Sequence, residues 1–72
     1  MDHDRRSIRL TLNGHVTELT ERTLADVVEA LGHEIRAIAT AVNGEFIGIA
    51  ARQQLMLKEG DLVEIVAPRQ GG

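Results

Sequence analysis

The last six residues of the chain, 67–72, are the part of the sequence best suited to chemistry. They follow an apolar run at 62–66, contain the chain's one proline and end in Gly-Gly. Pro68 fixes its own backbone angle and keeps Ala67 out of the helical region, so the chain should leave the run extended. At roughly 3.3–3.6 Å per residue, such a tail reaches about 20 Å. We therefore predict a flexible tail that presents the Gly72 carboxylate to a partner's active site.

The residue types of the tail suit insertion into a narrow passage. Gly71 and Gly72 have no Cβ and adopt angles closed to other residues. Ordering them costs about 1–2 kcal/mol per residue, so a partner must also contact the folded body. Arg69 and Gln70 lie between the body and the Gly-Gly, where they are expected to contact the same partner.

Acidic and apolar residues on and beside the run at 62–66 are the candidates for that body contact. The acidic side chains could pair with Arg or Lys of a partner, and the apolar ones could form a patch around them. The predicted partner-binding residues are Glu59, Asp61, Leu62, Glu64 and Val66. An alternative interpretation is that the acidic residues only keep an exposed sheet edge soluble.

Composition excludes several other classes of chemistry. The chain has no cysteine, which rules out disulfides, thiolate metal sites and a thiol nucleophile. Its one aromatic residue, Phe46, is interpreted as core, which leaves almost nothing on which bases could stack. The formal charge of −3 also disfavours nucleic acid. The three histidines show no metal-ligand spacing and are interpreted as surface residues: His3, His15 and His33.

No segment has the apolar length of a secretory signal or a membrane span, so the expected protein is soluble and cytoplasmic, with no membrane contact.

The first elements that must position the tail are a hairpin and a helix. Apolar residues alternate over 8–12, Asn13-Gly14 is a strong hairpin signal, and a second strand should return over 15–19. A helical stripe follows, with Thr23 as its N-cap, Asp26 in its first turn and Gly32 at its end. Its apolar members are Leu24, Val27, Val28 and Leu31.

The residue pattern in the second half of the chain predicts the remaining strands of a sheet. Residues 37–42 suit a central strand covered on both faces, Asn43-Gly44 turns the chain, and 45–49 predicts a short strand. The apolar residues of 50–54 show no helical or strand periodicity, so this stretch is predicted to be irregular. Leu55 and Leu57 are predicted to return to the core. A turn at 58–61 leads to the closing strand, in which Val63 and Ile65 face one way and the remaining three residues the other.

This order predicts an α+β protein of the β-grasp type, with a mixed sheet and one main helix packed on one face. The predicted organisation is a flexible extension at 1–7, one domain at 8–66 and the tail at 67–72. With 72 residues there is no room for a second core.

Three segments, taken in this order and spacing, match a known family: Val42 to Phe46, Leu57 to Val66 and Pro68 to Gly72. From Ile8 onward the chain resembles the ubiquitin-like sulfur carrier proteins of the ThiS and MoaD superfamily, and most of all the ThiS family. Members commonly carry a Pro-Arg-Ser-type segment after the Asn-Gly-Glu turn, where this chain reads Ile47 to Arg52 at about the same length. The difference bears on partner docking and leaves the predicted fold unchanged.

The resemblance implies a carrier and substrate, not an enzyme. An E1-like adenylating enzyme of the ThiF type would use Mg-ATP to convert the Gly72 carboxylate to an acyl adenylate. A sulfur donor such as a cysteine desulfurase would then yield a thiocarboxylate, and a thiazole synthase of the ThiG type would take the sulfur for the thiazole moiety of thiamine. Without cysteine, the terminal acyl carbon is the plausible place to hold sulfur. No cofactor is expected to stay bound, and the free chain is expected to be monomeric.

Other functions remain open at this point. The same chemistry could serve molybdopterin synthase, a tRNA thiolation enzyme or a cysteine-forming enzyme. The chain could instead be a protein modifier joined to lysines, as ubiquitin is, or a β-grasp interaction module with an inert tail. A modifier predicts lysine conjugates that need Gly72, a carrier predicts a thiocarboxylate, and an inert module predicts neither.

Overall fold

The computed structural model describes residues 6–67 of the chain. The elements are β1 (Ile8–Leu12), β2 (His15–Leu19), α1 (Leu24–Ala30), the 3-10 turn η2 (Ile35–Ala37), β3 (Ala39–Val42), β4 (Glu45–Ile47), α2 (Ile49–Arg52) and β5 (Leu62–Val66). Most of the predicted N-terminal extension, and all of the predicted tail except Ala67, lie outside the described residues.

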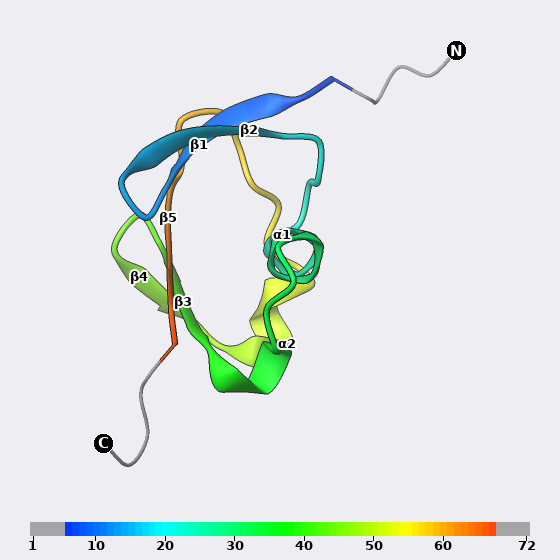
Figure 1. Ribbon diagram of the computed structural model, residues 1–72, viewed down its shortest axis with the longest axis vertical. Coiled ribbons are helices and arrows are strands. Elements are labelled where there is room, and N and C mark those ends of the chain that lie inside the picture. Colours follow the sequence, from blue (N-terminus) through cyan, green and yellow to red (C-terminus); the bar gives the residue numbers. More distant parts are fainter. Residues whose placement is uncertain (1–5, 68–72) are drawn as a thin grey trace.

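The five strands form one mixed sheet in the order β2-β1-β5-β3-β4. β1 and β5 are parallel, while β1 and β2, β3 and β5, and β3 and β4 pair antiparallel. α1 lies against one face of this sheet, as Figure 1 shows. The predicted β-grasp arrangement is therefore confirmed, and β5, which leads toward the C-terminus, is its central strand.

Both predicted Asn-Gly hairpins are present. Asn13 and Asn43 have φ angles of 49° and 51°, and the glycines after them have φ angles of 85° and 84°. Two successive positive φ angles define the turn type that best joins twisted antiparallel strands in a two-residue loop. Asparagine tolerates this conformation better than most residues, which explains why this dipeptide occurs at both positions.

The core is entirely aliphatic and lies between α1 and the sheet. Its buried members are Leu10, Leu24, Val27, Val28, Ile38, Val42, Leu57, Val63 and Ile65. The Thr23 side chain caps α1 by accepting a hydrogen bond of 3.1 Å from the Asp26 backbone N–H, as predicted. Gly32 follows α1 with a φ angle of 79°, whereas Leu31, the last member of the predicted stripe, stays 39% exposed.

Phe46 is not in the core, and its interpretation as a core residue was wrong. Its side chain is 71% exposed. In the β3–β4 register Phe46 lies opposite Ala41, while the buried residues of β3 are Thr40 and Val42. Because side chains alternate between the faces of a sheet, this register directs Phe46 to the face that α1 does not cover.

The segment between residues 35 and 54 differs most from the predicted structure. The strand predicted from residue 37 begins only at Ala39, because 35–37 form η2, and the strand predicted to reach residue 49 ends at Ile47. Residues 49–52, which had no clear period, form the one-turn helix α2. So short a helix cannot be stabilised by its own backbone bonds and depends on tertiary contacts.

Arg52 supplies those contacts from a buried position, 3% exposed. Its Nε donates to Oγ1 of Thr40 over 3.0 Å. Its two terminal nitrogens donate to the backbone carbonyls of Ile35 and Ile38, over 3.0 and 2.9 Å. One guanidinium therefore joins α2 to β3 and to the η2 turn that precedes it, and every one of these hydrogen bonds goes to a neutral oxygen.

Candidate functional site

The predicted site divides at Ala67, the last residue that the structure describes. The residues predicted to insert into a partner are Pro68, Arg69, Gln70, Gly71 and Gly72, and they lie outside the described residues. The described part of the site is therefore the strand from which the tail starts and the surface around it. Ala67 is exposed and follows directly after β5.

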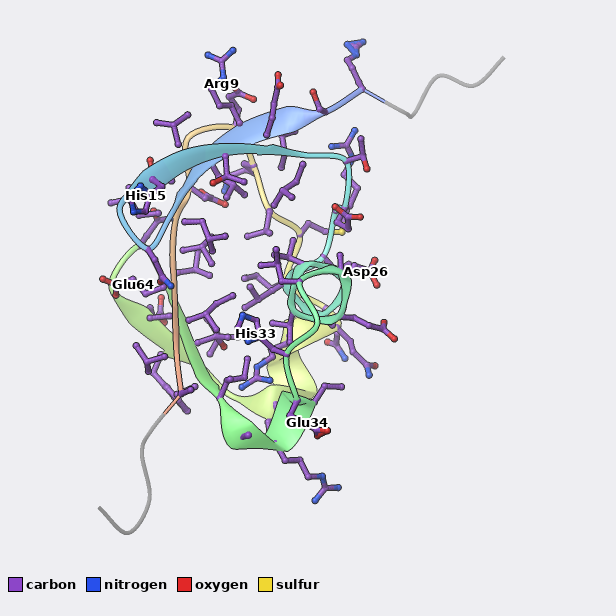
Figure 2. All side chains as sticks on the ribbon, in the orientation of Figure 1. Arg9, His15, Asp26, His33, Glu34 and Glu64 are labelled. Carbon is purple, nitrogen blue, oxygen red and sulfur yellow. The ribbon has the colours of Figure 1, made fainter. Side chains whose placement is uncertain are left out.

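The side chains of β5 alternate between the two faces of the sheet, as predicted. Val63 and Ile65 are buried beneath α1, while Leu62, Glu64 and Val66 are exposed. The exposed residues therefore lie on the opposite face of the sheet, and Figure 2 shows Glu64 on the side of β5 away from α1. Three of the five predicted partner-binding residues thus share one open surface beside the base of the tail.

The strand registers place further apolar side chains on this surface. Ala41 lies opposite both Glu64 and Phe46, and Thr11 lies opposite both Leu62 and Val16. We call the exposed set the outer-face patch: Val16, Phe46, Leu62 and Val66, at 71%, 71%, 53% and 56% exposure, with Glu64 among them. Thr11 and Ala41 lie between the central and the outer members, so the patch extends across the sheet from β2 to β4 on one face.

An exposed apolar surface of this kind is typical of a protein contact site. Glu64 adds a carboxylate within it, which would favour a partner that brings Arg or Lys to an apolar interface. Sequence reasoning missed Phe46 and Val16. The available signal was the Asn43-Gly44 turn. A two-residue turn fixes which residues of the two strands lie opposite each other, and so it fixes the face of the sheet on which Phe46 lies.

Asp61 does not belong to this surface, which corrects its prediction as a partner-binding residue. Its side chain is only 7% exposed. Its Oδ1 accepts a hydrogen bond of 3.1 Å from Asn43 Nδ2, and its Oδ2 accepts one of 2.8 Å from the Lys58 backbone N–H. Both oxygens are therefore used within the chain, where they close the turn before β5 around Gly60, which has a φ angle of 89°.

Glu59 is exposed and lies at the end of β5 opposite to the tail. Its Oε1 accepts a hydrogen bond of 3.0 Å from the Arg9 backbone N–H. Glu59 precedes β5, whereas the tail follows β5. The five residues of the strand, at roughly 3.3 Å each, place Glu59 more than about 15 Å from the start of the tail. Glu59 is therefore remote from the start of the tail, and its contact with a partner stays a prediction.

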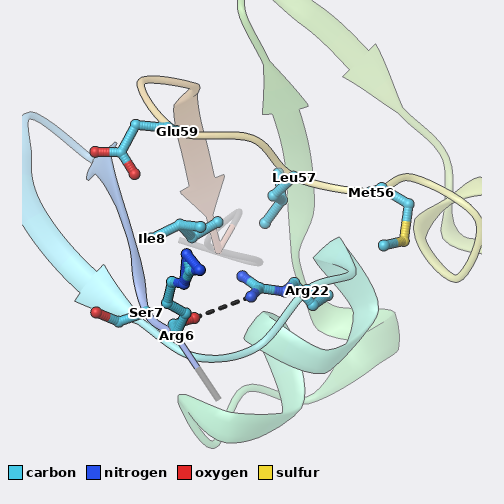
Figure 3. Close-up of a pocket in the computed structure, with 7 residues that line it drawn as sticks. All are labelled: Arg6, Ser7, Ile8, Arg22, Met56, Leu57 and Glu59. Atoms are coloured by element: carbon cyan, nitrogen blue, oxygen red, sulfur yellow. Dashed lines mark hydrogen bonds between the residues drawn. The ribbon is translucent and has the colours of Figure 1, made fainter. Parts of the chain in front are cut away.

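Glu59 instead borders an open cleft of about 610 Å³ near the start of β1, shown in Figure 3. Arg22 crosses this cleft and donates a hydrogen bond of 2.9 Å to the backbone carbonyl of Arg6. The other lining residues are Ser7, Ile8, Met56 and Leu57.

The two hairpin asparagines hold β5 from both sides. Asn13 Nδ2 donates to the Ile65 carbonyl over 3.1 Å, and Asn13 Oδ1 accepts from the Ile65 N–H over 2.8 Å. Asn43 Oδ1 accepts from the Leu62 N–H over 2.9 Å. The strand that carries the tail is therefore fixed at its beginning by one hairpin and near its end by the other.

Within residues 6–67 no three His, Cys, Asp or Glu side chains gather in a way that could hold a metal ion. In the same part of the chain, no helix has the length and apolarity needed to cross a membrane.

Comparison with known proteins agrees with this geometry. The ThiS family model matches residues 10–72. The sulfur carrier protein ThiS of Thermus thermophilus is 40% identical over 62 residues, which cover 85% of this chain and 95% of that protein. The crystal structure of the thiamine biosynthesis protein ThiS from Geobacter metallireducens superposes with a TM-score of 0.78 at 25% identity, covering 90% of this chain and 100% of that one. A solution structure of a thiamine biosynthesis protein from the same organism gives a TM-score of 0.74 at 25% identity, with 90% and 88% coverage. The chain belongs to the ThiS family, whose members are small sulfur carriers.

Proposed function

We propose that this chain carries sulfur as a thiocarboxylate on Gly72 and donates it for the thiazole moiety of thiamine. The observation that carries the proposal is the extent of the ThiS family match, which runs from residue 10 through the Gly-Gly at residues 71 and 72. The absence of cysteine supports it, because a thiolate or persulfide cannot hold the sulfur in this chain.

The proposed chemistry takes place in the active sites of partners. An E1-like adenylating enzyme of the ThiF type would bind Mg-ATP, and a Gly72 carboxylate oxygen would attack the α-phosphate with release of pyrophosphate. The terminal sulfur of a persulfide on a donor such as a cysteine desulfurase would then attack the acyl carbon and displace AMP. A thiol of a partner would reduce the resulting acyl disulfide, which releases the thiocarboxylate and leaves a disulfide on the partner. A thiazole synthase of the ThiG type would receive that sulfur, and an oxygen from the sulfur acceptor or from water would take its place on the acyl carbon, which regenerates the Gly72 carboxylate for the next cycle.

The carrier's own contribution is to bind and to position. The outer-face patch would dock on the adenylating enzyme, with its apolar side chains excluding water and Glu64 pairing with a basic residue. Since β5 leads directly from this patch into the tail, docking would place the start of the tail at the mouth of the partner's active site. Binding energy from the patch would offset the entropy lost when the glycines are ordered.

An intact-mass measurement tests this proposal. The chain, with nothing added after Gly72, is incubated with Mg-ATP, the host's adenylating enzyme and a sulfide source. We expect a mass gain equal to sulfur replacing oxygen, localised to Gly72 by fragmentation. The matched control is the chain that ends at Gly71, which should gain no sulfur. An unmodified full-length chain, under conditions in which the enzyme converts an established carrier, would contradict the proposal, and conjugates to lysine would favour a protein modifier instead.

A further inference from the structure

On the β1 edge, the C-terminal end of β5 is anchored by a side chain rather than by a strand. β1 bonds to β5 through the Thr11 N–H, which donates to the Asp61 carbonyl, and the Asn13 N–H, which donates to the Val63 carbonyl, over 3.0 and 2.9 Å. In a parallel pair the next bonds would join β1 to the N–H and C=O of Ile65. The main chain cannot supply them, because it turns back at Gly14.

The Asn13 side chain replaces those missing bonds. Its amide oxygen accepts from the Ile65 N–H over 2.8 Å, and its amide nitrogen donates to the Ile65 carbonyl over 3.1 Å. A primary amide has the same donor and acceptor as a peptide unit, so it extends the ladder by one more step. On the other edge of β5 the last paired residue is Val66, opposite Ala39.

From this geometry we propose that Asn13 is a positioning residue for the tail, a role that rests on the sulfur-carrier function proposed above. Its two hydrogen bonds hold Ile65 on the β1 edge, two residues before Ala67. If they are lost, the end of β5 is held from one edge only, and its last residues join the segment that must be ordered in the partner's active site. Each added residue increases the entropy lost on ordering, and the longer tether lowers the effective concentration of the carboxylate.

The second hairpin provides a matched control. Asn43 has nearly the same φ angle as Asn13 and also makes two side-chain hydrogen bonds, one of them to the Leu62 N–H at the beginning of β5. Glycine accepts positive φ without strain, so Asn13→Gly and Asn43→Gly each remove the side-chain bonds and leave the turn intact. Only Asn13→Gly releases β5 near the end from which the tail starts.

The first measurement is amide hydrogen exchange of the free carrier by NMR. With hydrogen bonds of ordinary strength, Asn13→Gly should speed exchange of the Ile65 amide roughly five- to tenfold. Asn43→Gly should instead speed exchange of the Leu62 amide. Unchanged exchange at Ile65 in the Asn13→Gly variant overturns the proposal, whatever the activity of the carrier.

The second measurement is ATP–pyrophosphate exchange by the host's adenylating enzyme as the carrier concentration is varied. Asn13→Gly should lower kcat roughly three- to tenfold with KM within about twofold, because the docking surface is intact and the tail is less well placed. Asn43→Gly should change neither by more than about twofold, although it loses a hydrogen bond to the buried Asp61 carboxylate and with it at least as much stability. Equal kcat values for the two variants would overturn the positioning role.

A third variant guards against a general loss of folding. Asn13→Asp keeps the acceptor for the Ile65 N–H and tolerates positive φ, but it loses the donor to the carbonyl. Its kcat and its Ile65 exchange rate should lie between those of the wild-type chain and Asn13→Gly; a kcat as low as that of Asn13→Gly without faster Ile65 exchange would contradict the proposal. If the wild-type carrier supports no pyrophosphate exchange, the proposed function fails, while the Ile65 amide still decides whether Asn13 holds the strand.

Discussion

Asn43 donates a hydrogen bond of 3.1 Å from its side-chain nitrogen to Oδ1 of Asp61. This bond joins the β3–β4 turn to the turn that begins β5, although the two residues are 18 positions apart in the sequence. Asp61 also accepts from the Lys58 N–H, so one buried carboxylate holds two turns together. Its role is therefore to set where the central strand begins.

Replacing Asp61 by alanine should destabilise the fold without a specific effect on docking. The change removes two hydrogen bonds to a largely buried carboxylate, so we expect a loss of about 2–3 kcal/mol in the free energy of unfolding. Urea denaturation followed by far-ultraviolet circular dichroism measures it, since the chain has no Trp or Tyr to report by fluorescence. Glu59→Ala, at an exposed residue with one such bond, is the control and should lose less than about 1 kcal/mol. Equal losses would show that burial of Asp61 adds nothing.

Replacing Arg52 by alanine should be among the most destabilising single changes in the chain. Three hydrogen bonds vanish, a cavity forms, and the carbonyls of Ile35 and Ile38 lose their donor. We expect about 3–4 kcal/mol by the same denaturation experiment. Lysine should restore little of this, because a single ammonium cannot reproduce the planar fork of the guanidinium. The neighbouring exposed residue gives the control, Gln53→Ala, for which a change above about 0.5 kcal/mol would be unexpected.

Charge reversal at Glu64 tests the outer-face patch. Glu64→Lys should leave the free energy of unfolding within about 0.5 kcal/mol, because the side chain is exposed. In the pyrophosphate-exchange reaction it should raise KM for the carrier roughly five- to tenfold, with kcat little changed. Glu29→Lys, at an exposed residue of α1, changes the formal net charge by the same amount, from −3 to −1. If both variants raise KM equally, net charge rather than Glu64 controls docking.

The apolar side chains of the outer-face patch can be tested separately from Glu64. Phe46→Ser should cost little stability, since the ring is mostly exposed, but it should remove apolar area from the proposed interface. A rise in KM of roughly tenfold is expected, and Phe46→Leu should recover much of it by restoring an apolar side chain. A normal KM for Phe46→Ser would place the interface elsewhere on the carrier.

The hairpins, the capped helix and β5 could be predicted because their signals are local. Asn13-Gly14 and Asn43-Gly44 specify two-residue turns by their own backbone preferences, and Thr23 with Asp26 marks the start of α1. Alternation in β5 also assigned its two faces correctly, since side-chain direction in a strand follows from sequence alone. The order of these elements along the chain then predicted the β-grasp arrangement.

The errors arose where distant contacts decide the outcome. α2 forms because Arg52 reaches carbonyls 14 and 17 residues away, which no local pattern reveals. Asp61 was predicted to bind a partner because it lies beside the closing strand, but its side chain is buried and bonded to Asn43, on another hairpin. Phe46 was assigned to the core from its residue type, whereas its face is set by the β3–β4 register. In each case the deciding partner lies in another element.

The central position of β5 has a mechanical consequence. A pull applied at Ala67 along the strand acts on a segment that is bonded to β1 and to Asn13 at one edge and to β3 at the other. Such a load falls on both rows of hydrogen bonds together, in shear, so they cannot open one after another as at a frayed edge. In the proposed function, in which partner enzymes take up the tail, a pulling force on the tail would therefore act on the strand best placed to resist it.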